Sequence, residues 1–121
     1  NYNKKIILID RFTDSTIAYQ HYGFGVELSI IKKINKFLLK DLKVDFTFLN
    51  FFNNKNMIKR LKLRKKLNRY DRFNSLFYQK VQKGFLKLAK SKKNKYLIID
   101  SNKDIKLNKN IILRKIDKLI K

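Results

Sequence analysis

The stretch "IDRFTDSTIAYQ" at residues 9–20 holds the side chains of this sequence that are best suited to chemistry. Asp10 and Arg11 stand where an apolar run, "KKIIL", is expected to end as a strand and a helix is expected to begin. A guanidinium beside the free N–H groups and the dipole of a helix N-terminus favours a phosphate. The carboxylate of Asp10 next to it suggests a metal-bound water or an orienting partner for a basic group.

Three residues of the same stretch are spaced to share one face of the expected helix. Thr16, Tyr19 and Gln20 stand at positions i, i+3 and i+4. A hydroxyl, a flat ring and an amide suit a nucleoside, because the ring can pack on the sugar or base while the polar tips meet the base edge. A capped helix with a surface Asp–Arg pair explains the same residues equally well, so the pattern alone leaves both interpretations open.

The elements that must position these groups follow from the hydrophobic pattern. Apolar runs predict strands, spacings of three and four predict amphipathic helices, and "GFG" at 23–25 should end the first helix. A single Gly84 should be tolerated inside a long helix. Strands that alternate with helices predict an α/β domain with a parallel sheet and right-handed crossovers. We expect strands at 4–10, 44–52 and 95–101. We expect one helix that begins at Thr13–Ser15 and further helices over about 28–38, 55–67, 77–89 and 109–120.

Composition excludes several classes of protein. A chain of 121 residues is one domain or less. No run approaches the roughly 18 apolar residues of a membrane span. The absence of cysteine and the single His21 exclude a disulfide scaffold and a thiolate or histidine-cluster metal site. We expect a cytoplasmic protein with no membrane partner, and we expect further sequence upstream, because the chain begins with Asn1 and has no leader pattern.

The net charge of +22 suggests nucleic acid as a partner. Of the 31 basic residues, however, 25 are Lys, and Lys, Ile and Asn together make up 53 of the 121 residues. All three have A/T-rich codons, so compositional drift explains the excess more simply than a dedicated phosphate-tracking surface. Lysine is also spread over every expected element. A basic nucleic-acid-binding α/β module is therefore the alternative interpretation, and we expect no specific nucleic acid.

The stretch "DRFTDSTIAYQ" resembles the "DR(Y/F/H)…S…AYQ" signature of bacterial thymidylate kinases, which phosphorylate dTMP to dTDP with ATP and Mg²⁺. The similarity continues in order along nearly the whole chain. "GFGVELSIIKKINKF" resembles the family's "GRGLDLELIKQLNEF", and "LKVDFTFLN" resembles "LKPDLTILLD". "RLKLRKKLNRYDRF" resembles the arginine-rich lid that leads into "DRFE", "FYQKVQKGFLKLAK" resembles "FHEKVREGYLELA", and "KYLIIDS" resembles "FVVIDA". Six motifs in order are highly specific.

The resemblance implies a fold and roles for particular residues. The fold is the three-layer fold of P-loop nucleoside-monophosphate kinases, with a parallel sheet that lacks its first strands here and a lid at about 60–73. Arg11 would hold the dTMP phosphate, and Asp10 would lie by the phosphates and the water of Mg²⁺. Thr16 and Gln20 would face the thymine, and Tyr19 the deoxyribose and base. The lid arginines that would close over ATP and stabilise the transferring phosphoryl group are Arg60, Arg64 and Arg69.

Four positions depart from the family pattern. Phe24 replaces the Arg between the two glycines, and Asn50 replaces the acid that usually ends the middle strand. Asn74 replaces the acid after "DRF", which loosens the expected anchoring of the lid. His21 stands where a Gly usually follows the Gln, and a surface role is expected for it.

The kinase chemistry needs a loop of the form "GxxxxGK[ST]" to cradle the ATP phosphates, and these 121 residues contain none. The resemblance implies that residues 1–121 are the C-terminal part of a single kinase domain, with that loop upstream. We therefore expect this portion alone to be inactive and at best marginally folded. A kinase of the same fold with another nucleoside or nucleotide substrate, and a non-catalytic remnant, stay as alternatives. The family also implies a possible homodimer.

Overall fold

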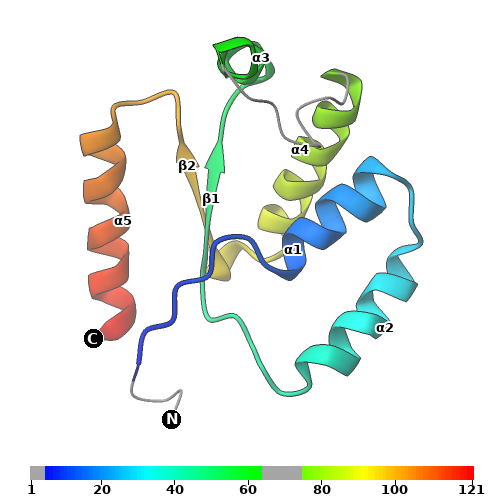
Figure 1. The fold of residues 1–121 in the computed structure, drawn as a ribbon. Helices are drawn as coiled ribbons and strands as arrows, with labels where there is room; N and C mark the ends of the chain where they lie inside the picture. Colours follow the sequence, from blue (N-terminus) through cyan, green and yellow to red (C-terminus); the bar gives the residue numbers. More distant parts are fainter. Residues whose placement is uncertain (1–4, 64–74) are drawn as a thin grey trace.

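A computed structural model describes residues 5–63 and 75–121 of the chain. The elements form three layers, with a parallel two-stranded sheet between one helix and a group of helices (Figure 1). The elements in chain order are α1 Thr13–Thr16, the π-helix η2 Ile17–Gly23, α2 Leu28–Leu39, β1 Thr47–Phe51, α3 Asn54–Leu63, α4 Ser75–Ser91, the short 3₁₀ helix η4 Lys93–Lys95, β2 Tyr96–Asp100 and α5 Ile105–Ile120. The α/β class, the parallel pairing and the order of the elements from α1 onward were predicted correctly.

The sheet joins two segments that lie far apart in the sequence. Thr47 pairs with Tyr96 and Phe51 with Asp100, so both strands end at the same edge. Helix α3 follows β1 at that edge, at the top of the molecule in Figure 1. Ligands of open α/β sheets bind beyond the carboxyl ends of the strands, so this edge is where a site is expected.

The core lies between the sheet and helices η2 and α4. Its buried apolar side chains come from η2, α2, α4 and β2, and they are Ile17, Ala18, Ile31, Tyr78, Val81, Ala89, Tyr96 and Ile99. The opposite face of the sheet is more open, because every residue of α5 stays at least partly exposed and Ile98 of β2 is exposed as well. The expectation of buried strands is thus correct only for the face toward α4.

The strand expected at residues 4–10 is wrong over its described part, residues 5–10. These residues form neither a helix nor a strand, and the side chains of Ile6 to Ile9 are more than half exposed. A parallel strand exists only where a neighbour accepts its backbone hydrogen bonds. In the described part of the chain β1 and β2 pair with each other and not with this segment.

Three helix boundaries also differ from expectation. Helix α3 starts at Asn54, and the expected residues 64–67 of this helix lie outside the described residues. Helix α4 extends from Ser75 to Ser91, slightly beyond its apolar stripe. Helix α5 begins at Ile105 rather than 109, because Asp104 occupies its N-cap and its Oδ2 accepts a hydrogen bond from the backbone N–H of Leu107 at 3.3 Å.

Candidate nucleotide site

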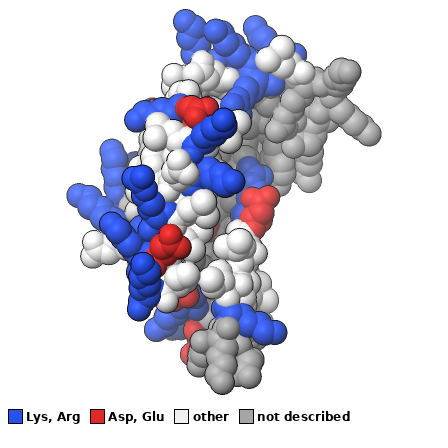
Figure 2. Space-filling view, turned by 90° about the vertical axis from the view of Figure 1, so that its left-hand side faces the viewer, with Lys and Arg blue, Asp and Glu red and all other residues white. Residues whose placement is uncertain are grey.

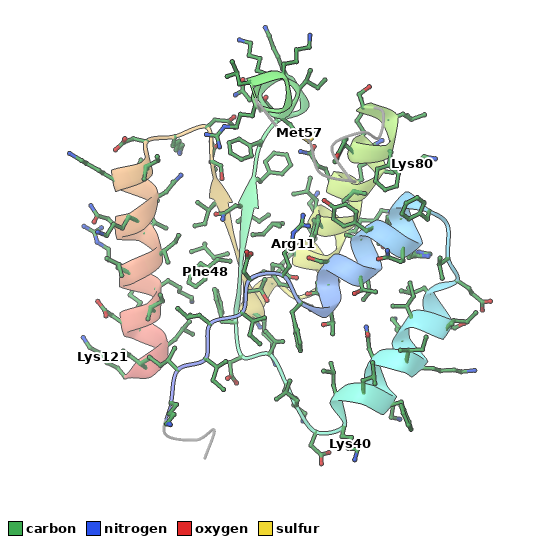
Figure 3. All side chains as sticks on the ribbon, in the orientation of Figure 1. Arg11, Lys40, Phe48, Met57, Lys80 and Lys121 are labelled. Atoms are coloured by element: carbon green, nitrogen blue, oxygen red, sulfur yellow. The ribbon has the colours of Figure 1, made fainter. Side chains whose placement is uncertain are left out.

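The backbone at Arg11 has an unusual conformation. Arg11 has φ +62°, in the left-handed region that non-glycine residues seldom adopt. Figure 3 shows Arg11 near the middle of the molecule, on the side of the sheet that faces α1 and α4. The chain therefore turns sharply between the irregular segment 5–10 and α1.

Arg11 and Tyr19 form the central contact of the candidate site. The Nη2 of Arg11 donates a hydrogen bond to the Tyr19 hydroxyl at 2.9 Å, and its Cζ lies 5.1 Å from the centre of the Tyr19 ring. The ring of Tyr19 packs in turn against Phe77 and Phe85 of α4, at centroid distances of 6.2 and 6.3 Å. The guanidinium is thus directed at a tyrosine that the core holds in place.

Tyr19 also lines a cavity of about 160 Å³ beside the carboxyl end of β1. The lining side chains are neutral: aromatic and aliphatic groups with the amides of Asn50 and Gln82. They come from η2, β1, α3 and α4 and are Tyr19, Leu49, Asn50, Phe51, Phe52, Met57, Tyr78, Val81, Gln82 and Phe85. A wider hollow of about 500 Å³ at the end of α4 and at η4, residues 90–95, has lysines and short polar side chains on its wall, with no aromatic ring to hold a base.

The predicted face of Thr16, Tyr19 and Gln20 is only partly present. The helix widens into a π-helix from Ile17, which changes the angle between successive side chains, so the spacing of an α-helix no longer applies. Thr16, the last residue of α1, is exposed, and neither it nor Gln20 lines the cavity. The structure therefore brings Arg11 and Tyr19 together and leaves Thr16 and Gln20 outside this contact.

Helix α1 starts within the predicted range, at Thr13, but none of the polar side chains of Thr13, Asp14 and Ser15 caps it. Phe12 occupies the N-cap, and its side chain has no oxygen to cap the helix. Asp14 instead accepts a hydrogen bond from the hydroxyl of Tyr96, and its carboxylate pairs with Lys92 at 3.1 Å. Burial, the hydrogen bond to Asp14 and the charge of that carboxylate together raise the pKa of Tyr96 far above its usual value, so Tyr96 stays a protonated donor. This contact ties the turn at Arg11 to β2.

A polar cluster at the end of β2 was missed by the sequence analysis. The backbone N–H and the side-chain amide of Asn102 donate to Asp100 Oδ1 at 3.0 and 2.8 Å, and Asn56 of α3 donates to Asn102. Hydrogen bonds from the Asn102 backbone and side chain, with Lys103 nearby, lower the pKa of the Asp100 carboxyl. The "DSN" sequence after a predicted strand is the signal that could have indicated such a cluster.

Of the remaining predicted residues, Asp10 is exposed beside Arg11. Arg60 of α3 lies with its Cζ 4.1 Å from the centre of the Phe52 ring, next to the cavity. Arg64, Arg69 and most of the predicted lid, residues 64–73, lie outside the described residues.

Two of the positions that depart from the family pattern have structural roles. His21 hydrogen-bonds through Nδ1 to the carbonyl oxygen of Val26 at 2.8 Å, which closes the turn after η2. The ring of Phe24 packs on Phe77 with 4.8 Å between centroids. Both contacts involve residues at the end of η2 or in the connection from η2 to α2.

Three comparisons with known proteins bear on the family of this chain. The thymidylate kinase family model matches residues 1–112. The chain is 37% identical over 100 residues to the thymidylate kinase of Sulfurihydrogenibium sp. (strain YO3AOP1), covering 83% of this chain and 48% of that protein. It is 44% identical over 86 residues to the thymidylate kinase of Wolbachia pipientis wMel, covering 70% of this chain and 41% of that protein.

A solved structure shows the same relation. The crystal structure of thymidylate kinase from Ehrlichia chaffeensis is similar to 98% of this chain with a TM-score of 0.62 and 30% sequence identity, and the match covers 53% of that protein. The chain thus spans about half the length of the relatives that it matches. In the described parts of the chain, no helix is both long and apolar enough to cross a membrane. With a family model that matches nearly all of its residues, the chain belongs to the thymidylate kinase family.

Proposed function

We propose that this chain supplies the dTMP side of a thymidylate kinase, which transfers the γ-phosphoryl group of ATP to dTMP and gives dTDP. The observation that carries the proposal is the contact of Arg11 with Tyr19 at 2.9 Å, beside a neutral aromatic cavity at the carboxyl edge of the sheet. A guanidinium suits the phosphate of the nucleotide, and a fixed phenol ring suits its sugar and base.

The proposal assigns each residue a task. Arg11 binds the phosphate of dTMP, and Tyr19 orients Arg11 and packs against the deoxyribose. Thr16 and Gln20 reach the thymine from the adjoining turn. Because neither residue lines the cavity, the proposal places dTMP beside the cavity rather than inside it.

The family implies Mg²⁺ with ATP, and the residues present fit a metal held mostly by water and phosphate. Within residues 5–63 and 75–121 no three acidic, histidine or cysteine side chains group closely enough to form a metal cage. Mg²⁺ keeps several waters and takes one or two carboxylates plus substrate phosphates. The exposed carboxylate of Asp10 can hold such a water beside Arg11. When bound, the metal would neutralise negative charge on the phosphate oxygens.

Positive charge from the lid completes the proposed site. Phosphoryl transfer depends mainly on positioning and on stabilising charge spread over the transferring group. Arg60 lies beside the cavity, and Arg64 and Arg69 follow it in the sequence. We assign these three arginines to the ATP phosphates.

The high net charge has no separate role in this proposal. Figure 2 shows the face of the molecule on the α5 side, where Lys and Arg are spread over most of the visible surface, with a few acidic residues and uncharged residues between them. A dedicated nucleic-acid module would gather its cations into one stripe with aromatic rings between them. We propose a cytoplasmic enzyme without a specific nucleic-acid partner and with a homodimer as its assembly, which sedimentation can check.

Binding of dTMP to the chain tests the proposal directly. Titration followed by calorimetry should detect dTMP, and dAMP should bind at least tenfold more weakly. Arg11→Ala should weaken dTMP binding by roughly a hundredfold, since a charged hydrogen bond and an ion pair to phosphate are lost together. Arg114→Ala, on the exposed side of α5, is the matched control and should bind like the parent.

Turnover requires the phosphate loop that these 121 residues lack. Fusion of the chain to the loop-containing part of the Ehrlichia chaffeensis enzyme should restore dTMP-dependent ADP formation, and Arg11→Ala should reduce it by orders of magnitude. Unchanged turnover in that variant would refute the role given to Arg11.

A further inference from the structure

Gln82 of α4 connects three elements of the structure, although no predicted role falls on it. Its half-buried Nε2 donates a hydrogen bond to the backbone carbonyl of Phe52 at 2.9 Å and approaches the Sδ of Met57 at 3.6 Å. Phe52 directly follows β1, and Met57 belongs to the second turn of α3. Figure 3 shows Met57 on the side of α3 that faces the end of β1. One amide thus fixes the turn by which the chain leaves the sheet and enters α3.

The same turn supports an arginine. The Phe52 ring lies under the guanidinium of Arg60, with 4.1 Å from Cζ to the ring centre. Within the described ranges, 5–63 and 75–121, no carboxylate lies within ion-pair distance of Arg60. Among the described residues, stacking on Phe52 restrains this exposed side chain.

The backbone on the α3 side of this turn is also fixed. Asn53 caps α3, since its Oδ1 accepts a hydrogen bond from the backbone N–H of Asn56 at 2.9 Å and its carbonyl accepts one from Met57 N–H at 3.0 Å. With Asn53 holding the start of the helix and Gln82 holding Phe52, the ring of Phe52 has one direction relative to α3. Arg60, two turns into the helix, then meets the face of that ring.

We propose that Gln82 is a positioning residue, which holds the Phe52 turn so that the guanidinium of Arg60 stays stacked beside the cavity, ready for the phosphate oxygens of a nucleoside triphosphate. This assignment rests on the proposed function for its ligand, but the position of Arg60 can be tested without any ligand. A neutral amide suits the task because it donates to a carbonyl without adding a charge next to Arg60.

Nuclear magnetic resonance of the whole chain tests the positioning directly. A guanidinium stacked on an aromatic ring has its δ-methylene and Nε–H signals shifted upfield by the ring current. Gln82→Met keeps the length of the side chain and its helix propensity but removes the donor. The upfield shift of Arg60 should fall to the value seen in Phe52→Leu, which has no ring.

The matched control is Gln79→Met, the same substitution three residues earlier in α4 at a position that does not line the cavity. Its Arg60 signals should stay at the parent position. Arg60 signals that are unchanged in Gln82→Met would overturn the proposal. If Gln82→Met does not fold, Gln82→Glu serves in its place: a carboxylate cannot donate to the carbonyl of Phe52, and the same loss of shift is expected.

Titration with ATP separates this proposal from the proposed function. ATP should move the Arg60 signals of the parent and of Gln79→Met at about fivefold lower concentration than those of Gln82→Met. If ATP moves no Arg60 signal in the parent, the phosphate role of Arg60 is wrong, whereas the ring-current comparison still decides whether Gln82 positions that side chain.

Discussion

The guanidinium of Arg11 and the phenol of Tyr19 form one unit, in which Nη2 donates to the hydroxyl at 2.9 Å while Cζ lies 5.1 Å from the ring centre. The backbone of Arg11 is in the left-handed region, at φ +62°, which costs roughly 1 to 2 kcal/mol for a non-glycine residue. Strain of this kind persists where surrounding contacts determine the conformation. We interpret the left-handed backbone of Arg11 as the feature that directs its guanidinium toward the Tyr19 hydroxyl.

Tyr19→Phe tests whether this orientation matters for binding. The substitution keeps the ring and its packing but removes the acceptor for Arg11. We expect the affinity for dTMP to fall about three- to tenfold, the loss typical of a partly exposed hydrogen bond to a charged group. Calorimetric titration measures the affinity for dTMP. The control is Tyr22→Phe, which also loses a hydroxyl but keeps its ring packed against Gly84 of α4. Equal affinity in Tyr19→Phe and the parent would contradict an orienting role for the hydroxyl.

Tyr96→Phe should change both stability and its dependence on pH. Loss of the buried hydrogen bond to Asp14 should lower the free energy of unfolding by about 1 to 2 kcal/mol at neutral pH. Because the pKa of Tyr96 is raised in the folded chain, its contribution is present below pH ~10 and is lost as the pH rises above that value, where only the unfolded tyrosine ionises.

Urea unfolding between pH 8 and 11 measures this effect. Lysines also titrate there, so the informative quantity is the difference between the parent and Tyr96→Phe, which should shrink as the pH passes 10. A difference that stays constant over this range would show that Tyr96 ionises alike in both states.

The order of elements could be predicted because each depends on local pattern. The apolar stripe of α2, the run that becomes β2 and the "GFG" break are all visible in the sequence. Arg11 and Tyr19, which the sequence singles out, lie in contact in the structure, and both belong to one short segment. These features need no knowledge of what packs against them.

Other features depend on partners distant in sequence and could not be predicted. Asp14 has the chemistry of an N-cap, but Tyr96, 82 residues away, binds its carboxylate instead. The run at residues 5–10 has the composition of a strand, but a strand also needs a neighbour in the sheet. The change from α-helix to π-helix at Ile17 alters the spacing that would have put Thr16, Tyr19 and Gln20 on one face, and no residue pattern indicates it.

Asp104→Ala tests the helix start that the sequence analysis placed too late. Helix α5 has no fully buried residue, so it depends more on local interactions than the other long helices do. Loss of the bond from Leu107 N–H to the Asp104 carboxylate should cost about 1 kcal/mol and reduce helix content. Circular dichroism during thermal unfolding measures both quantities.

Asp117→Ala is the matched control in the same helix. An acid near the C-terminal end opposes the helix dipole, so its removal should leave stability unchanged or slightly raised. Equal losses in the two variants would contradict a capping role for Asp104.

Gly84→Ala tests the close approach of α4 and η2. In an exposed helix this substitution would stabilise the protein by about 1 kcal/mol. Here the added Cβ would lie 2.5 Å from Cδ2 and 2.7 Å from Cγ of Tyr22. Because Cγ lies close to the backbone, the ring cannot rotate away, and overlap of this kind costs roughly 1 to 3 kcal/mol. We expect the free energy of unfolding to fall by about 1 kcal/mol or more, as measured in urea.

Tyr22→Ala provides the second half of the test, because it removes the two nearest ring atoms and leaves only the Cβ of residue 22, at 2.9 Å from the added Cβ. Gly84→Ala should be much less harmful in that background, with a coupling of about 1 kcal/mol between the two sites. If Gly84→Ala stabilises the parent chain instead, then η2 and α4 do not pack at this distance. The ring of Tyr19, held between the same two elements, would then lose the fixed position that Arg11 requires.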